Sequence, residues 1–207
     1  DACSIKSVVA GKHGWKYGAD NPARVYVYGS PLTSTNILLT CTSDGDKGHL
    51  YVRDSRSAVS AGGSGWDKLV QYGKKPTSVS ISASIDSTIL CGQAVCTSTS
   101  IQSKVVVSNS RARYTQDGGL TSTIDLWDGN YRMKNASGTG GTWNIYGGYF
   151  DMTESANRWT PVTINLWRGT LNTKGGIDVL TTPSSAFNSL HPEGRLVLDN
   201  GRVIAVT

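Results

Sequence analysis

The chain has 207 residues, a mass of 22.0 kDa and a formal net charge of +5, with 24 glycines but only two methionines. Its apolar runs are far shorter than the roughly 20 residues that a membrane-spanning helix needs, so we predict no transmembrane segment. Strong helix formers are scarce and Gly, Ser and Thr are abundant, which favours strands and turns. We therefore expect an all-β protein that forms one domain over residues 1–207.

Alternating apolar and polar residues predict a series of short strands in the first half of the chain. The clearest is 77–85, in which four apolar residues alternate with serines. The glycine-rich stretch 11–22 carries Trp15 and Tyr17, which fits either a ligand-binding loop or a lid that packs its own aromatic rings. Further strands, separated by Gly, Pro or Asp turns, are predicted at 4–10, 24–28, 36–41, 49–53, 88–91 and 101–108.

A seven-residue phrase occurs twice, at 123–129 and 163–169, with five identical positions. In each copy apolar residues alternate with polar ones, which predicts a half-buried strand that ends at Trp127 or Trp167. Trp127 then shares a face with Asp125, so we expect both indoles on a polar face. The alternative is that a second layer covers this face and buries both tryptophans. With only two copies, 40 residues apart, the phrase does not indicate a solenoid.

The segment between the two phrases is rich in aromatic residues and glycine. Residues 145–150 predict a hairpin with a two-glycine turn. A tryptophan ring beside carboxylate and amide groups suits a saccharide, because a pyranose stacks its apolar face on the ring and bonds its hydroxyls to the polar groups. We therefore predict a ligand-binding surface made of Asp125, Trp127, Asp128, Tyr131, Arg132, Trp143, Tyr146, Tyr149, Trp167 and Arg168.

The C-terminal part of the chain predicts one more hairpin, because Asn200 and Gly201 lie between two alternating segments and favour a type I′ turn. Residues 183–192 are the one stretch that suits a short helical turn. The predicted segments amount to roughly a dozen to sixteen strands. This number favours a β-sandwich or an elongated β-barrel of mainly antiparallel strands, immunoglobulin-like or jelly-roll-like.

Four cysteines form an even set in a chain rich in Ser, Thr and Gly, which favours two disulfides. Of the three possible connectivities we expect Cys3–Cys41 and Cys91–Cys96, because the second closes a small loop that contains a glycine. The start at Asp1, without methionine or an apolar leader, predicts a mature secreted protein. A zinc site is the alternative, but the three histidines are far apart in the sequence, so we predict no metal and no other cofactor.

The positive charge is concentrated in residues 1–75, which hold ten Lys or Arg against six acids, whereas the remainder holds ten against nine. A basic region of this kind favours binding to anionic glycans or to a membrane surface. A basic face that contacts only solvent is the more common explanation of such a charge distribution. A nucleic-acid-binding protein needs a denser basic stripe, and the aromatic and basic segment 12–17 is its only counterpart here. We therefore predict no nucleic-acid partner.

Catalysis on a polysaccharide is the alternative function. Glycoside hydrolysis needs two carboxylates that lie roughly 5–9.5 Å apart, and the best pair in this sequence combines Asp125 with Asp151 or Glu154. A lyase needs a tyrosine or histidine base beside a neutralising arginine or asparagine, for which Tyr131-Arg132 and Arg113-Tyr114 are possible pairs. Nothing in the sequence marks either set out, so we expect binding without turnover.

The cysteine layout and strand style resemble the receptor-binding domain of bacterial chaperone–usher pilus tip adhesins. The resemblance rests on the start Asp1-Ala2-Cys3, on Cys41, on the Ser/Thr alternation and on the short loop from Cys91 to Cys96, and it includes no receptor-contact residue. It implies a β-sandwich at the cell surface that binds a glycan receptor, with other pilus subunits as further partners. Such adhesins continue into a pilin domain, so a chain that ends at Thr207 is expected to be either the isolated tip domain or not a member of this family.

A structural pilus or coat subunit is the third possibility. It predicts an unpaired edge strand that is open to assembly.

Overall fold

The computed structural model describes residues 7–10, 23–29, 37–41, 48–119, 121–134, 138–139, 141–154, 159–160, 163–173, 187–191 and 193–197. These residues form strands and turns, which confirms the prediction of an all-β chain. No helix long and apolar enough to cross a membrane is found among them.

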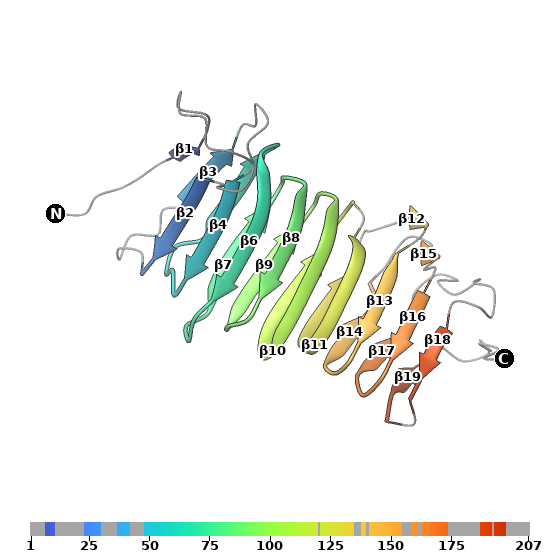
Figure 1. Ribbon diagram of the computed structural model, residues 1–207. Helices are drawn as coiled ribbons and strands as arrows, with labels where there is room; N and C mark the ends of the chain where they lie inside the picture. The colour runs from blue at the N-terminus through green and yellow to red at the C-terminus, as the bar shows by residue number, and fades with distance from the viewer. Residues whose placement is uncertain are drawn as a thin grey trace.

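The strands stack side by side in parallel as successive turns of a β-solenoid (Figure 1). Each turn contributes one strand to a first sheet and one to a second sheet. The first sheet contains, in spatial order, β2 (Ala23–Tyr28), β4 (Gly48–Arg53), β6 (Trp66–Tyr72), β8 (Ile85–Leu90), the first parts of β10 (Gln102–Gln116) and β11 (Thr121–Met133), β13 (Thr142–Ile145), β16 (Thr163–Leu166) and β18 (Phe187–Leu190).

The second sheet is built in the same way on the other side of the core. It contains β1 (Ser7–Ala10), β3 (Ile37–Cys41), β5 (Val59–Gly63), β7 (Thr77–Ile81), β9 (Ala94–Ser98), the second parts of β10 and β11, β14 (Tyr149–Asp151), β17 (Thr170–Asn172) and β19 (Arg195–Val197). A separate parallel pair joins β12 (Gly138–Thr139) to β15 (Trp159–Thr160).

The predicted architecture of mainly antiparallel strands was therefore wrong, whether as a sandwich or as a barrel, immunoglobulin-like or jelly-roll-like. Each strand pairs in parallel with the strand one turn away, and this includes β9, β10 and β11, which are neighbours in sequence because β10 and β11 each run through both sheets. The supposed hairpin at 145–150 shows the difference. Its two arms, β13 and β14, lie in different sheets, and each pairs in parallel with β11. The turn at Gly147 and Gly148 is thus a corner of the solenoid.

The duplicated phrase is also part of this repeat. Leu126 pairs with Ile145, and Ile145 pairs with Leu166, so the two copies of the phrase lie two turns apart with β13 between them. The sequence did not indicate a solenoid because the turn between the two copies has the same geometry as the phrase but different residues. Residues 187–190, expected near a helical turn, form strand β18. The Asn200-Gly201 hairpin and the loop 11–22 lie outside the described residues.

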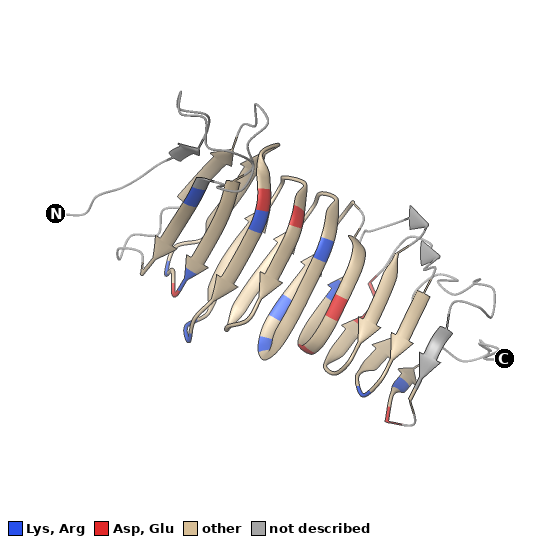
Figure 2. Ribbon diagram, in the orientation of Figure 1, with Lys and Arg blue, Asp and Glu red and all other residues tan. Residues whose placement is uncertain are grey.

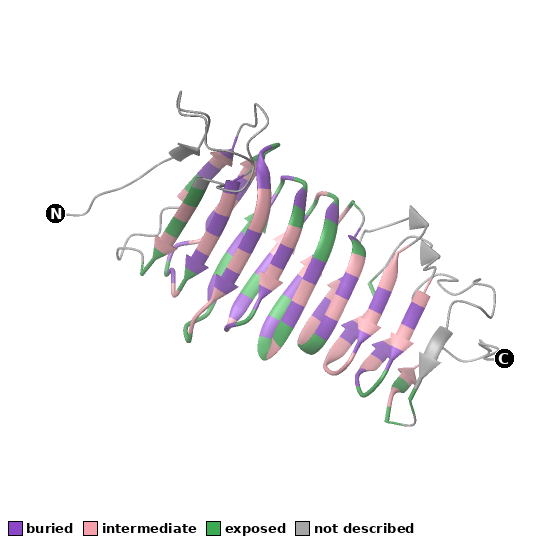
Figure 3. Ribbon diagram, viewed as in Figure 1, coloured by how far each residue is buried: buried purple, intermediate pink, exposed green. Residues whose placement is uncertain are grey.

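The core is the interior between the two sheets, where inward side chains stack in columns from turn to turn (Figure 3). Tyr114 stacks on Tyr131 at a ring-centroid distance of 5.1 Å, and Tyr131 stacks on Phe150 at 4.8 Å. Trp143 lies against Phe150, also at 4.8 Å. No described Lys, Arg, Asp or Glu is buried, and these residues are confined to the outer faces and corners (Figure 2). Burial of the apolar columns is the main stabilising contribution to the stack.

Two buried glutamines form hydrogen-bond networks inside the core. The Gln102 side chain donates to the carbonyl of Ala83 and to Ser98 Oγ, both at 3.1 Å, and accepts from Thr88 Oγ1 at 3.1 Å. Gln116 Oε1 accepts from the Tyr114 hydroxyl at 2.8 Å and from Thr121 Oγ1 at 2.9 Å. A buried polar group without such partners would cost free energy, so these networks fix the order of the central turns.

The described cysteines are free thiols, which corrects the Cys91–Cys96 disulfide prediction. Cys91 is exposed at a corner, whereas Cys96 points into the core from β9. Because the two side chains leave opposite faces of the wall, they cannot be bridged without a change of backbone. Cys41 is buried and free, and its expected partner Cys3 lies outside the described residues.

Candidate functional site

The corner at which the chain passes from the first sheet to the second repeats the same geometry in successive turns. The backbone N–H of Tyr146 donates to the carbonyl of Leu126, Trp167 donates to Ile145, and His191 donates to Leu166, each at 2.8 Å. Tyr146 and Trp167 directly follow Ile145 and Leu166, which are the last inward-pointing residues of their first-sheet strands, and His191 directly follows the last residue of β18. We call this position the corner column, and it contains Trp127, Tyr146, Trp167 and His191.

Glycines behind the corner column allow successive turns to approach closely. Gly148 has a φ of +71°, and a Cβ at this position would lie 2.6 Å from the carbonyl oxygen of Gly129. Gly129 itself has a φ of +86°. Side chains other than hydrogen are disfavoured in this left-handed region. The two glycines therefore bring the corner residues of neighbouring turns into contact.

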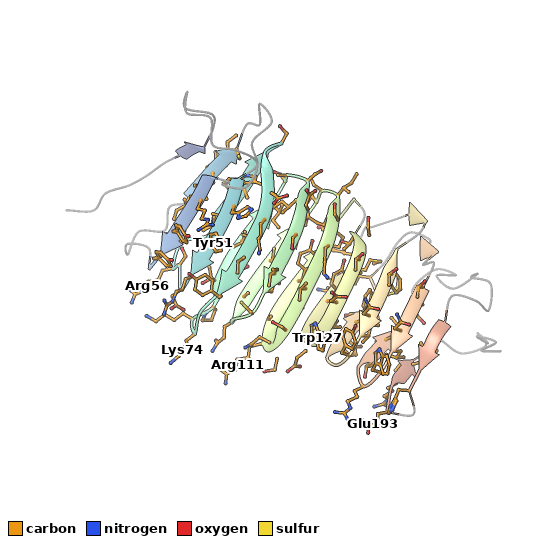
Figure 4. The ribbon with its side chains drawn as sticks, in the orientation of Figure 1. Tyr51, Arg56, Lys74, Arg111, Trp127 and Glu193 are labelled. Carbon is orange, nitrogen blue, oxygen red and sulfur yellow. The ribbon has the colours of Figure 1, made fainter. Side chains whose placement is uncertain are left out.

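The corner column is a continuous stack of rings. Trp127 and Tyr146 lie nearly parallel, with centroids 4.0 Å apart and 15° between the ring planes. Tyr146 and Trp167 are 6.3 Å apart, and Trp167 and His191 are 6.2 Å apart. Figure 4 shows Trp127 and Glu193 along the lower edge of the solenoid. Both indoles are exposed, as predicted from the alternation of the phrase.

Stacking makes the two tryptophans unequal. Trp167 has a ring on each side, and its exposed fraction is 40%. Trp127 is 54% exposed, and Tyr146 is its only ring partner among the described residues. Its other face points towards the preceding turn, where the backbone pairs Asp128 with Ser108. The Ser108 side chain is small and exposed, and no ring among the described residues stacks on this face of Trp127.

A polar ladder runs beside the corner column on the outer face of the first sheet. Lys104 Nζ lies 2.7 Å from Asp125 Oδ2, and Asn144 Nδ2 donates to Asp125 Oδ1 at 2.7 Å. Asn165 Nδ2 then donates to Asn144 Oδ1 at 2.7 Å. These bonds occupy both oxygens of the Asp125 carboxylate. Asp125 therefore holds neighbouring turns in register, and its carboxylate has little capacity left for a ligand.

Charged groups of the corner itself are more accessible. Arg168 Nε lies 2.7 Å from Glu193 Oε2, and both side chains are largely exposed. Asp128 is exposed, and its Oδ1 accepts from the backbone N–H of Gly129 at 2.7 Å. An exposed ion pair of this kind contributes little to stability and exchanges readily with other polar partners.

The structure brings together some of the residues predicted to bind a ligand and separates others. Trp127, Asp128, Tyr146, Trp167 and Arg168 meet at the corner, with Asp125 beside them. Tyr131 and Trp143 point inward and are fully buried, because they alternate with outward residues on β11 and β13. As core residues they cannot contact a ligand on the surface.

Arg132 and Tyr149 lie on the outer face of the second sheet, away from the corner column. Arg132 pairs with Glu154, and the Tyr149 hydroxyl accepts from the side-chain amide of Asn172. Their place in the sequence between the two tryptophans did not predict their place in space, because each turn carries residues to both sides of the solenoid.

The residue sets considered for catalysis are not brought together. Asp125 belongs to the first sheet. Asp151 ends β14 in the second sheet and accepts from Thr153, and Glu154 follows that strand and pairs with Arg132. Tyr131 and Tyr114 are buried, and burial raises the pKa of both phenols, so neither can serve as a surface base near neutral pH. Among the described residues no three His, Cys, Asp or Glu side chains cluster in a way that could hold a metal ion.

A second aromatic cluster, in the first turns, was missed at the sequence level. Tyr26 stacks between Tyr28 and Tyr51 at centroid distances of 5.7 and 4.9 Å. The Tyr72 hydroxyl donates to the Tyr28 hydroxyl at 3.1 Å, and this bond raises the pKa of Tyr72 to about 12. Arg53 lies over the Tyr72 ring at 5.8 Å. A pocket of about 370 Å³ opens here, lined by Tyr28, Gly29, Arg53 and Asp54.

One signal could have revealed both clusters. At four corners the last inward residue of a first-sheet strand is followed directly by an aromatic residue, and a glycine comes one or two positions later. These aromatic residues are Tyr72, Trp127, Tyr146 and Trp167. The intervals between the last three are 19 and 21 residues, which is one turn each. A search for apolar-aromatic-glycine corners would have found the repeat where a search for identical phrases did not.

Comparison with known proteins adds no family to this description. No protein-family model matches the sequence, and neither a curated protein nor a solved structure matches the chain.

Proposed function

We propose that the chain binds a polysaccharide, without turnover, along the corner column, with the open face of Trp127 as the main platform. One observation carries the proposal: Trp127 is 54% exposed, Tyr146 stacks on one of its faces at 4.0 Å, and no ring among the described residues stacks on the other. A rigid indole with one free face is the group that stacks on a pyranose ring at low entropic cost.

Polar groups around the platform suit the hydroxyls of a sugar. Asp128 follows Trp127 directly and is exposed, and the Arg168–Glu193 pair lies two turns further along the corner. The turns of the solenoid repeat every ~4.8 Å, the separation of neighbouring strands in a sheet. This repeat is comparable to the length of one pyranose unit, so an extended polysaccharide can place one sugar beside each corner turn.

The position of the protein at a cell surface, as an adhesin, remains part of this proposal and rests on the sequence. The pilus resemblance stays a prediction, since no comparison bears on it, and the β-sandwich that it implied is not the fold of this chain.

The experiment is a carbohydrate array followed by titration of each polysaccharide that binds, with Trp127→Ala and Trp167→Ala variants. We expect Trp127→Ala to weaken binding by roughly tenfold, the value of a lost aromatic stack. We expect a smaller loss for Trp167→Ala, because both faces of that ring are already occupied.

Ile101→Ala is the matched control, since Ile101 is also 54% exposed but lies at the opposite corner. Its affinity should equal that of the wild type. Unchanged binding by a folded Trp127→Ala variant would reject the platform. Release of reducing or unsaturated sugars from a bound polymer would instead favour the enzyme.

A further inference from the structure

Exposed cations line the same corner edge on the N-terminal side of Trp127. Arg56 lies in the turn between β4 and β5, Lys74 and Lys75 lie between β6 and β7, and Arg111 lies at the bend of β10. Figure 4 shows Arg56, Lys74, Arg111 and Trp127 in sequence along one lower edge, with their side chains directed away from the sheets. The first half of the edge therefore carries exposed cations beside the Tyr28 and Tyr72 rings, and the second half carries the corner column.

Among the described residues none of these four side chains forms a salt bridge, although the charge of Lys75 contributes to the lowered pKa of Asp54. Elsewhere Lys104 pairs with Asp125, Lys134 with Asp117, and Arg168 with Glu193. The one acid near Lys74 and Lys75 is Asp54. Its Oδ1 accepts the backbone N–H groups of Lys74 and Lys75 at 2.7 and 2.8 Å, and these bonds lower the pKa of Asp54.

Asp54 therefore fixes the turn that presents the two lysines. Arg53, on the same turn as Asp54, is 3.5 Å from its carboxylate and covers Tyr72, so it is already engaged. The ammonium groups of Lys74 and Lys75 remain directed to solvent.

We infer that the polysaccharide of the proposed site is polyanionic, and that Lys74, Lys75 and Arg111 hold its carboxylate or sulfate groups while Trp127 stacks on one of its rings. This inference rests on the proposed function and adds the charge of the ligand. Arg111 precedes Trp127 by one turn and Lys74 precedes Arg111 by two, which places the cations ~5 Å and ~15 Å from the platform. Acidic polysaccharides carry their charges at similar intervals of one or two sugars.

The same spacing disfavours a nucleic acid as the ligand. Duplex DNA carries about one negative charge for every 1.7 Å of its axis, and its binding proteins match this density with clustered cations. Here the cations are interrupted by the uncharged corner at Cys91, Gly92 and Gln93. The rings of the corner column stack on one another, so only Trp127 offers a face on which a ligand ring could stack. A single-stranded nucleic acid would need several such faces for its unstacked bases.

The test compares binding by two charge-matched variants. The first removes the edge cations as Lys74→Gln, Lys75→Gln and Arg111→Gln. The second removes the same charge from the second sheet and the opposite corner as Arg132→Gln, Lys134→Gln and Arg195→Gln. The probes are polygalacturonate, alginate, hyaluronan and heparin, carboxyl-reduced polygalacturonate and dextran as neutral polymers, and duplex DNA. Unfolding curves establish that both variants are folded.

We expect at least one acidic polymer to bind more tightly than the neutral ones, with an affinity that falls as salt is raised. The edge variant should lose roughly tenfold or more in affinity, because each charged contact contributes a few-fold. The control variant should lose about twofold at most. Equal losses in the two variants, equal binding of neutral and acidic polymers, no binding of any acidic polymer, or equally tight binding of DNA would each overturn the inference.

A Trp127→Ala arm separates this inference from the proposed function. If Trp127→Ala weakens binding and the edge variant does not, the platform stands and the charge assignment fails. If the edge variant weakens binding and Trp127→Ala does not, the platform is rejected, and with it the joint site that we infer.

Discussion

Replacement of Gly148 by alanine tests the close contact between corner turns. The added Cβ would lie 2.6 Å from the carbonyl oxygen of Gly129 and 2.9 Å from the carbonyl carbon of Asp128 and the nitrogen of Gly129. These are backbone atoms, which cannot move aside as a flexible side chain can. The φ of +71° adds a second cost, since alanine disfavours this region.

The expected loss of stability follows from these two terms. The left-handed conformation costs alanine about 1–2 kcal/mol, and the forced overlap costs about 1–3 kcal/mol. Together they give a destabilisation of roughly 2–5 kcal/mol, which lowers the midpoint of urea unfolding by about 1 M or more. Since the same corner sets the Trp127–Tyr146 stack, the near-UV circular dichroism of the folded variant should also change.

Gly62 provides the matched control. It lies in strand β5 without a positive φ, and its added Cβ would meet only the Ser82 side chain, at 3.4 Å. Gly62→Ala should therefore be neutral or stabilise the chain by up to about 1 kcal/mol through the unfolded state. The reasoning is refuted if Gly148→Ala unfolds at the same urea concentration as Gly62→Ala.

Three further predictions concern the core and the thiols. Phe150→Ala removes a fully buried ring that stacks on Tyr131 and Trp143. It should lower the free energy of unfolding by about 3–5 kcal/mol. A loss below about 1 kcal/mol would contradict the packing of this ring. Burial raises the pKa of Tyr114 and Tyr131, so the folded state holds both protons more tightly than the unfolded chain, whose tyrosines titrate near pH 10. Stability should therefore be intact below about pH 10 and fall as the pH rises further, with phenolate absorbance of these two residues appearing only on unfolding; titration of all nine tyrosines in the folded protein would disagree. Cys91 should react with a maleimide in the native protein, whereas Cys41 and Cys96 should react only after unfolding, and recovery of a disulfide-linked peptide containing Cys91 and Cys96 would disprove the free thiols.

The local structure of the chain was largely predictable, but its pairing was not. The alternation in 77–85 correctly turns Val79 and Ile81 inward, but the strand ends at Ile81, and Ile85 begins β8 in the other sheet. The same alternation arises in any strand with one buried face, so it does not distinguish an antiparallel sandwich from a parallel solenoid. The glycines at 147 and 148 likewise suit a hairpin turn and a solenoid corner equally well. Direction of pairing depends on the residue one turn away, which no local pattern identifies.

The candidate site was predictable in part for the same reason. Exposure of Trp127 and Trp167 followed from their faces relative to Asp125 and Asn165, because face alternation is a local property. Tyr131 and Trp143 were chosen because they lie between the tryptophans in sequence, yet their own alternation turns them inward. The cations of the corner edge were scattered through the sequence and became one group only when the turns were stacked.

The parallel, in-register stacking of turns is the claim on which the corner column and the basic edge depend, and a cysteine cross-link tests it most directly. Thr123 pairs with Thr142 in the neighbouring turn, and Thr142 pairs with Thr163 in the next, all partly exposed on the outer face of the first sheet. In a background with the four native cysteines replaced, the account predicts that the pair Thr123→Cys and Thr142→Cys forms a disulfide under mild oxidation, because its Cα atoms lie ~4.8 Å apart. The pair Thr123→Cys and Thr163→Cys, two turns apart, should remain reduced. A disulfide in the second pair but not in the first would contradict the parallel register, and with it the alignment of Trp127, Tyr146 and Trp167.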